Sequence, residues 1–314
     1  MRHMALLDRH KADRLGDALF KGAALFFAVS VLVLMGLIFI VLLAEAMPAL
    51  RAFGLRFLYT AEWDPVRSVF GALPAIYGTI VSSVIALVIA VPISLGIAVF
   101  LTEMAPKPLA GPIGTAIELL AAIPSIIYGM WGLFILAPLL ADHVEPFLNN
   151  WLGFIPFFRG APLGIGMLPA GFILAVMIIP FISSVARDIF RMVPPILKES
   201  GYGVGATKWE VIHQVVLPYT RSGIIGAVVL GLGRALGETM AVTFLIGNSY
   251  DISSELFNPA TSISASLANE FTEAVDPVHI SSLVALGLIL FVITFIVLAA
   301  AKLLIRKTVN GDAR

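Results

Sequence analysis

Six apolar runs, each about 20 residues or longer, constrain this chain of 314 residues more than any other feature. A helix of that length crosses the hydrocarbon of a bilayer and satisfies its own backbone hydrogen bonds, which an open backbone in lipid cannot do. The runs are Ala23–Leu43, Leu73–Leu101, Ile113–Leu139, Gly164–Val185, Gly223–Ile246 and Leu283–Ile305. They predict an all-α polytopic membrane protein with six transmembrane helices.

The composition excludes several other classes of protein. Charged residues make up 13 % of the chain and apolar residues 59 %, whereas an ordinary soluble domain is about 25 % charged. This excludes a soluble enzyme, and also a disordered chain, which would be rich in charge. The absence of cysteine excludes disulfides and thiolate metal sites. The formal net charge of zero gives a role in nucleic-acid binding no support.

No internal repeat or low-complexity linker divides the chain, so we expect one transmembrane domain, residues 23–314, after a cytoplasmic segment, residues 1–22. Within that segment, Leu6–Phe20 mixes apolar and charged residues and is either a helix on the membrane surface or a frayed tail. Leu50–Tyr59 is expected to form a short interfacial helix. Prolines in the second and third runs predict kinks or tilts. These are Pro74, Pro92 and Pro124.

The distribution of Lys and Arg predicts the orientation. If the runs are membrane spans, 15 of the 20 basic residues fall on the side that holds both termini, four fall on the other side, and Arg234 lies inside the fifth run. Cytoplasmic loops carry the excess of Lys and Arg, so both termini are expected in the cytoplasm of a bacterial inner membrane. The last outer loop, residues 247–279, contains no Lys or Arg and is acidic. Within it, Ala265–Glu270 has helical spacing, and the loop is expected to fold over the outer mouth.

The longest cytoplasmic loop, Arg187–Arg221, is expected to contain two short helices, Ile196–Gly205 and Lys208–Val216, before Pro218 starts the next span. Most connections in helix bundles are only about two to eight residues long. Tyr202 and Trp209 in this loop either form a partner surface or pack against the ends of the spans.

The loop contains Glu199-Ser-Gly-x-x-x-Gly205, then nine residues, then Val215-Val-Leu-Pro218. This spacing resembles the coupling-loop motif of ABC importer permeases, E-A-A-x3-G-x9-I-x-L-P, from which it departs at Ser200-Gly201 and Val215. The resemblance implies that the loop docks on a separate ATPase subunit. The implied coupling residues are Glu199, Ser200, Gly201, Gly205 and Ala206. The chain has no G-x-x-x-x-G-K-[ST] motif, so ATP and Mg²⁺ are expected in the partner, with no cofactor and no metal bound here.

Two charged residues, Arg234 and Glu238, lie inside the fifth run. Each costs roughly 2.5–3.5 kcal/mol at bilayer depth on insertion scales, and at a spacing of four they can pair on one helix face. That face also holds small residues, which leave space for another helix or for a solute. One interpretation is therefore a packing seam around a buried ion pair. The other is that the guanidinium attracts an oxyanion, whose two oxygens its planar donors match. In that case Glu238 holds the arginine when the path is empty and accepts a proton from hydrogen phosphate, which favours phosphate over sulfate.

Four strings, beginning at Phe70, Glu118, Gly233 and Thr261 and including Gly233-Arg-Ala-Leu-Gly-Glu-Thr-Met-Ala-Val242, resemble those of PstC-type permeases of phosphate ABC importers. This implies the type I ABC importer permease fold and a role for Arg234 and Glu238 in phosphate passage. It also implies that the chain does no covalent chemistry. The implied partners are a PstA-type permease, two copies of a PstB-type ATPase and a periplasmic phosphate-binding protein, in addition to inorganic phosphate and membrane lipid.

Residues of the third run have two interpretations. Glu118 is either a carboxylate that reaches toward the cytoplasm or an inner gate, and Ser125 and Tyr128 either flank an ordinary proline kink or line the path. His213 and His279 are expected to be solvated surface residues, without metal-ligand spacing. The remaining alternatives for the whole chain are a permease for sulfate or molybdate, an ion-coupled secondary transporter, and a non-transporting scaffold.

Overall fold

The computed structural model describes the backbone of residues 2–311 and the side chains of residues 17, 19–106 and 108–303. Within that part of the chain the regular structure is helical, as predicted, and six helical stretches are long and apolar enough to cross a membrane. The helices, in order, are α1 (Arg2–Phe53), α2 (Arg56–Tyr59), α3 (Leu73–Val99), η1 (Phe100–Met104), α4 (Lys107–Ala121), α5 (Ser125–Trp131), η2 (Gly132–Leu136), α6 (Ala137–Leu139), η3 (Leu140–Val144), α7 (Glu145–Leu152), η4 (Pro156–Phe158), α8 (Met167–Arg191), α9 (Pro195–Gly203), α10 (Lys208–Val211), η5 (Ile212–Val216), α11 (Leu217–Leu236), α12 (Met240–Leu245), α13 (Ile263–Glu270) and α14 (Pro277–Gly311).

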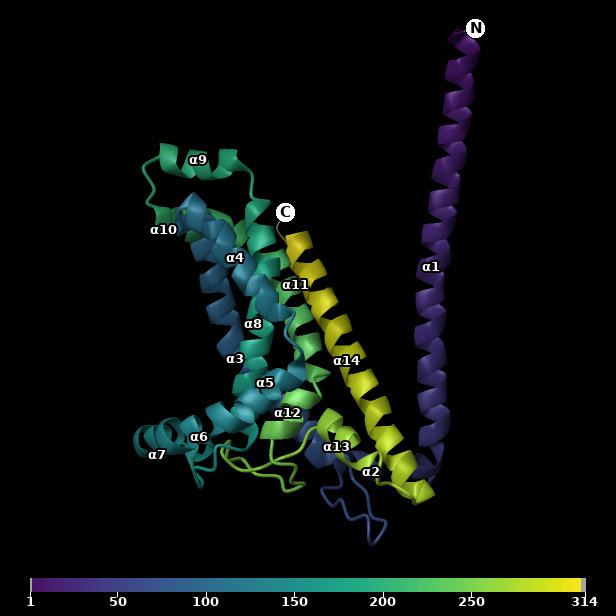
Figure 1. Cartoon of the computed structure of the whole chain (residues 1–314), viewed down its shortest axis with the longest axis vertical. Helices are drawn as coiled ribbons and strands as arrows, with labels where there is room; N and C mark the ends of the chain where they lie inside the picture. The colour runs from purple at the N-terminus through teal and green to yellow at the C-terminus, as the bar shows by residue number, and fades with distance from the viewer. Residues whose placement is uncertain (1, 312–314) are drawn as a thin grey trace.

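Helix α8 is the best-buried span of the bundle and packs against α3 and α11 (Figure 1). Small residues allow this close approach. A Cβ added at Gly171 of α8 would lie 2.5 Å from Cγ2 of Ile85 in α3, and one added at Gly231 of α11 would lie 2.6 Å from Cδ1 of Ile182 in α8. Lipid provides no hydrophobic force between helices, so such van der Waals contact is what holds them together.

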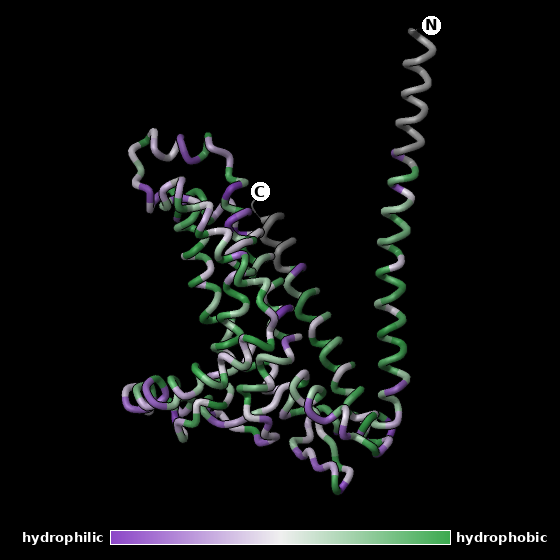
Figure 2. The backbone as a smooth tube through the Cα atoms, viewed as in Figure 1, coloured by the Kyte–Doolittle hydropathy of each residue, from purple (hydrophilic) through white to green (hydrophobic). Residues whose placement is uncertain are grey.

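Helix α1 lies apart from this bundle. The C-terminal part of α1 contacts α14, and α1 diverges from the other helices along most of its length (Figure 1). Its middle stretch, residues 22–44, contains no charged residue and is largely hydrophobic (Figure 2). Residues 6–20, expected as a separate surface helix or a frayed tail, are a continuous part of α1. The expected interfacial helix Leu50–Tyr59 is also divided. Its first four residues end α1, and after Gly54, with φ of +57°, α2 forms a separate turn.

Two of the six predicted spans are interrupted: the third at Pro124, where a kink was predicted, and the fifth, whose prediction as a continuous helix was wrong. In the third, α4 ends at Ala121 and α5 begins at Ser125, because Pro124 lacks the N–H that would continue the helical hydrogen bonds. Helices α5 to α7 then run across the lower end of the bundle in Figure 1. In the fifth, α11 ends at Leu236 and α12 begins at Met240. Its start was also misplaced, because α10, η5 and α11 are continuous through Pro218.

The two ends of the molecule differ. The loop that contains α9, the start of α1 and the end of α14 lie at one end, which we call the α9 end (Figure 1). Helices α7 and α13 and the segment between α2 and α3 lie at the other, which we call the α13 end. This places the elements on the two sides that the basic residues predicted.

Candidate functional site

Arg234 lies in the last turn of α11, and Glu238 lies in the interruption before α12. The expected pairing of these residues on one continuous helix face was therefore wrong, and among the described residues no ion pair joins them. Instead, the Glu238 carboxylate is 3.5 Å from the backbone N–H of Ala241, in the first turn of α12. Arg234 is exposed in this chain and Glu238 is half-buried. A guanidinium on the exposed surface of an apolar span requires a polar or charged partner outside this chain.

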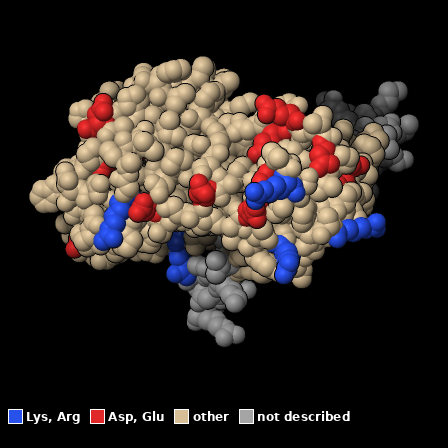
Figure 3. All heavy atoms as spheres, turned by 90° about the horizontal axis from the view of Figure 1, so that it is seen from below, with Lys and Arg blue, Asp and Glu red and all other residues tan. Residues whose placement is uncertain are grey.

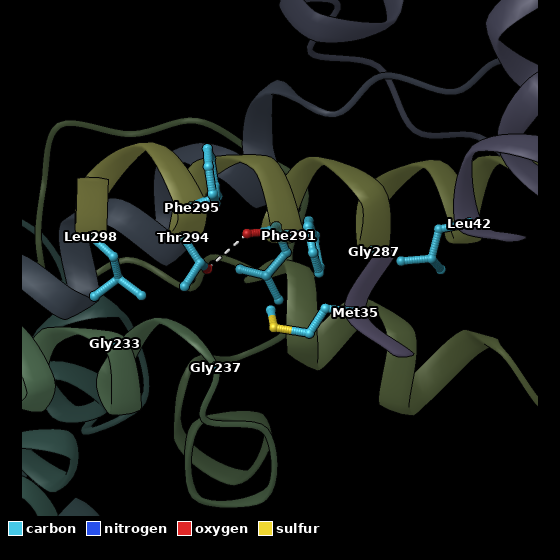
Figure 4. Close-up of a pocket in the computed structure, with 10 residues that line it drawn as sticks. Met35, Leu42, Gly233, Gly237, Gly287, Phe291, Thr294, Phe295 and Leu298 are labelled. Carbon is cyan, nitrogen blue, oxygen red and sulfur yellow. Dashed lines mark hydrogen bonds between the residues drawn. The ribbon is translucent and has the colours of Figure 1, made fainter. Parts of the chain in front are cut away.

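The small residues near Arg234 form a packing surface, which is one of the two predicted alternatives. Gly231 packs against α8, as described above, and an added Cβ at Gly223 would lie 2.8 Å from Ile189 in the same helix. Gly233 and Gly237 line a groove of about 350 Å³ between α1, α11 and α14 (Figure 4). No charged side chain is among its lining residues. This groove therefore does not have the chemistry of an anion path.

Tyr128 and Ser125 are brought to the same region by α5. An added Cβ at Gly129 would lie 3.1 Å from the Cα of Ala241, so α5 crosses α12 in direct contact. The Tyr128 hydroxyl donates to the carbonyl of Leu120 at 2.9 Å and so connects α5 to the last turn of α4 across the Pro124 interruption. The helices that follow the two interruptions, α5 and α12, therefore lie in contact, and Arg234 is in the last turn of the helix that leads to α12.

Glu118 forms an ion pair with Arg187, which connects α4 to the last turn of α8. Arg187 is 9 % exposed, and sequence reasoning counted it only as a loop charge. Gly114, one helical turn before Glu118, makes room for it, since an added Cβ there would lie 2.2 Å from a guanidinium nitrogen. An acidic residue inside an apolar run needs a partner, and that requirement could have identified this pair. Glu118 is therefore neither free nor directed only at solvent.

The predicted coupling motif forms an exposed helix-turn-helix. Helix α9 confirms the first predicted helix, and Gly205, with φ of +88°, makes the turn that follows it. The Ala206 N–H donates to the carbonyl of Gly201 at 3.1 Å. Thr207 then begins α10 with reciprocal hydrogen bonds to Glu210. The second predicted helix continues into the span and is not a separate element.

The surface of this loop is apolar and open to a partner. Side chains that are between 43 % and 86 % exposed project from it: Ile196, Tyr202, Val204 and Trp209. Glu199 and Ser200 are also exposed, and the Ser200 hydroxyl donates to the Ile196 carbonyl. At the base of the loop, Lys198 of α9 contacts Glu103 of η1 at 2.5 Å, so the loop is tied to the end of α3.

The two histidines differ. His213 is exposed, as expected. His279 is 8 % exposed and contacts the Glu270 carboxylate at 2.8 Å, so its prediction as a solvated residue was wrong. Glu270 ends α13 and His279 lies in the first turn of α14, so the periodicity of neither helix gave a signal that they meet.

Comparison with known proteins shows consistent similarity. A family model described as "Binding-protein-dependent transport system inner membrane component" matches residues 90–310. A Mesorhizobium japonicum protein named phosphate transport system permease protein PstC is 57 % identical over 96 % of this chain and 92 % of its own. A PstC of Haemophilus influenzae is 54 % identical over 93 % of each chain.

Solved structures agree on the fold. A bacterial ABC transporter that imports alginate matches with a TM-score of 0.54 at 20 % identity, over 83 % of this chain and 88 % of its own. The inward-facing methionine transporter MetNI matches with a TM-score of 0.52 at 18 % identity, over 77 % and 95 %.

Proposed function

The chain belongs to the binding-protein-dependent inner membrane transport components and, among these, to the PstC phosphate permeases, and from this membership we propose how it acts. It is the multi-pass inner-membrane subunit of an ATP-driven phosphate importer. Phosphate crosses between this chain and a PstA-type permease, and two PstB-type ATPase subunits bind and hydrolyse ATP with Mg²⁺. Access then alternates between the two sides of the membrane.

The observation on which this depends most is the position of Arg234. Arg234 is exposed in the last turn of α11, just before the interruption that leads to α12, and α12 contacts α5, which carries Ser125 and Tyr128. Exposed in lipid it would be costly. Facing a path between two permease subunits, it would donate to two phosphate oxygens at once. Glu238, Ser125 and Tyr128 complete the proposed path.

Glu238 is free of an internal ion pair among the described residues, so it is available to accept a proton from a protonated oxyanion. Sulfate has no proton to donate at neutral pH and would be repelled. The same residues would distinguish phosphate import from import of sulfate or molybdate.

The loop that contains α9 is proposed as the ATPase-docking element, with Glu199, Ser200, Gly201, Gly205 and Ala206 at the contact. Its exposed apolar side chains support this, because such a patch marks an interaction surface. The Lys198–Glu103 and Arg187–Glu118 pairs then connect the docked loop to α3 and α4. In this proposal Glu118 acts at the inner end of the path by holding α4.

In this proposal both termini lie in the cytoplasm, which is supported by the start of α1 and the end of α14 sharing an end with α9 (Figure 1). The α13 end then faces the periplasm and the phosphate-binding protein. Figure 3, which views the molecule from this end, shows Asp and Glu spread over the surface with Lys and Arg among them. The loop of residues 247–279 contains acidic residues and no Lys or Arg. This loop would repel free phosphate, so phosphate would arrive enclosed in its carrier.

The test is uptake of labelled phosphate into vesicles that contain the assembled complex, with and without ATP. Arg234→Ala should abolish uptake, and Arg56→Ala, which removes an exposed arginine near the α13 end, should leave it intact. Glu238→Gln should weaken the discrimination against sulfate. Unchanged uptake in Arg234→Ala and Glu238→Ala would return both residues to the packing interpretation. Uptake driven by an ion gradient without ATP would favour a secondary transporter.

A further inference from the structure

The Glu270 carboxylate is the meeting point of three separate segments at the α13 end. Trp63 donates its indole N–H to Oε2 at 2.9 Å, Tyr250 donates its hydroxyl to Oε1 at 2.5 Å, and Nε2 of His279 contacts Oε2 at 2.8 Å. Trp63 lies between α2 and α3, Tyr250 between α12 and α13, and His279 in the first turn of α14. One carboxylate therefore joins the end of α13 to three other parts of the chain.

Ring packing makes this cluster rigid and keeps most of it from water. The rings of Trp63 and Tyr250 are stacked with centroids 5.1 Å apart, and those of Phe70 and His279 are stacked at 5.0 Å. Trp63, Phe70 and His279 are each less than 10 % exposed. Burial and the hydrogen bond to Glu270 raise the pKa of Tyr250 above its usual range, so its hydroxyl remains a proton donor.

The position of Glu270 is unfavourable for α13 considered alone. It is the last residue of that helix, and a negative charge at a helix C-terminus is destabilising. The three partners stabilise the carboxylate at this position. These tertiary contacts, more than the helical propensity of α13 itself, therefore fix the position of the helix.

The other side of α13 faces the interruption between α11 and α12. Ser264, Ala268 and Thr272 line a groove together with Gly237 and Thr239. Gly237 and Thr239 flank Glu238 and follow Arg234 by three and five residues. Ser264 is only 5 % exposed, so this side of α13 is packed within the chain beside the segment that follows Arg234.

We propose that Glu270 is a positioning residue that holds α13 closed over the outer end of the path, and that loss of its three contacts opens this end. The assignment rests on the proposed function for the identity of the path. The position of α13 itself can be measured without any transport.

The first measurement is the accessibility of a single cysteine, for which the cysteine-free chain is suited. Ser264→Cys changes an oxygen to a sulfur at a buried position on the path side of α13. In intact cells that carry the assembled complex, a membrane-impermeant maleimide should label it slowly. Adding Glu270→Gln should raise the rate about tenfold or more, because α13 opens locally. Val275→Cys, at a position 91 % exposed in the same loop, should label quickly in both backgrounds.

Matched variants separate positioning from general unfolding. Glu273→Gln removes an exposed carboxylate three residues away and should leave Ser264→Cys protected. Tyr250→Phe keeps the ring stack and removes one donor, so it should give an intermediate rate. Glu270→Asp should restore part of the protection. If Ser264→Cys labels equally slowly with and without the added Glu270→Gln substitution, the proposal is wrong. If all variants, including Glu273→Gln, label quickly, α13 does not cover this site and the proposal is equally wrong.

The second measurement is phosphate uptake by the same complexes. Glu270→Gln should lower uptake per ATP hydrolysed, while Glu273→Gln should not. If Glu270→Gln speeds labelling but the parent complex takes up no phosphate, the positioning role stands and the proposed substrate is wrong. Normal coupling in Glu270→Gln together with fast labelling would show that α13 is not a gate.

Discussion

The Arg187–Glu118 pair leads to an asymmetric prediction. The Arg187 side chain is 11 % exposed and that of Glu118 is 45 % exposed. Removing the acid by Glu118→Gln leaves a buried guanidinium that cannot lose its proton. Its nearest remaining acidic partner is Asp188, with Oδ1 3.9 Å from Nε. Breaking a fully buried pair costs about 3–5 kcal/mol. Because Asp188 and the glutamine oxygen remain as partners, we expect Glu118→Gln to lower the free energy of unfolding by about 2–3 kcal/mol.

Removing the arginine should lower the free energy of unfolding by less than removing the glutamate does. Arg187→Met keeps most of the buried stem that packs beside Gly114, and the half-exposed Glu118 can turn to water. We therefore expect about 1 kcal/mol or less, as for exposed pairs. The double variant should resemble Arg187→Met, because the uncompensated guanidinium is then gone.

Thermal unfolding of the detergent-solubilised complex measures this order. With about 2–4 °C for each kcal/mol, Glu118→Gln should lower the midpoint by roughly 4–12 °C and Arg187→Met by no more than about 4 °C. Asp142→Asn, which removes an exposed carboxylate in η3 away from this pair, is the control and should have little effect. If Arg187→Met is as damaging as Glu118→Gln, or if the two effects add in the double variant, the burial argument fails.

Three further outcomes follow from local geometry. Gly205→Val places a β-branched residue at φ of +88° and should disrupt the turn after α9, so that the ATPase subunit no longer co-purifies. The control is Gly203→Ala, which should be tolerated because an added Cβ there meets no atom within 4 Å. Tyr128→Phe removes the hydroxyl bonded to the Leu120 carbonyl and should lower phosphate uptake several-fold at an unchanged level of assembled complex, which vesicle assays and blotting together measure. Gly78→Val places a Cβ 1.9 Å from the carbonyl oxygen of Thr261 and should reduce the folded protein in the membrane to a small fraction of the parent level, measured by extraction into mild detergent.

Apolar length alone predicted the uninterrupted elements well. Helices α3, α8 and α14 coincide with predicted spans to within a few residues or one to two turns, because a bilayer requires about 20 apolar residues and accepts few alternatives. Helix α9 was predicted by glycine and proline at its ends. The fold class follows from the same requirement for apolar length, and the charge asymmetry between the two ends follows from the preference of Lys and Arg for cytoplasmic loops.

The helix interruptions and the long-range side-chain pairs were harder to predict from the sequence. A span interrupted at Gly237 has the same apolar composition as a continuous one, so hydropathy cannot separate them. The contacts of Glu118 with Arg187 and of Glu270 with Trp63 join residues far apart in sequence. Only tertiary packing brings them together. Charged residues in apolar surroundings could have shown that partners exist, without showing which ones.

The joint between α4 and α5 has a mechanical consequence. A continuous helix resists bending because its ladder of backbone hydrogen bonds must stretch or break. At Pro124 that ladder is already absent, and a single side-chain hydroxyl, that of Tyr128, spans the gap. The two segments can therefore change their mutual angle at the cost of one replaceable contact. With the α11–α12 interruption, this joint gives the bundle two positions at which helices can bend without breaking a continuous hydrogen-bond ladder.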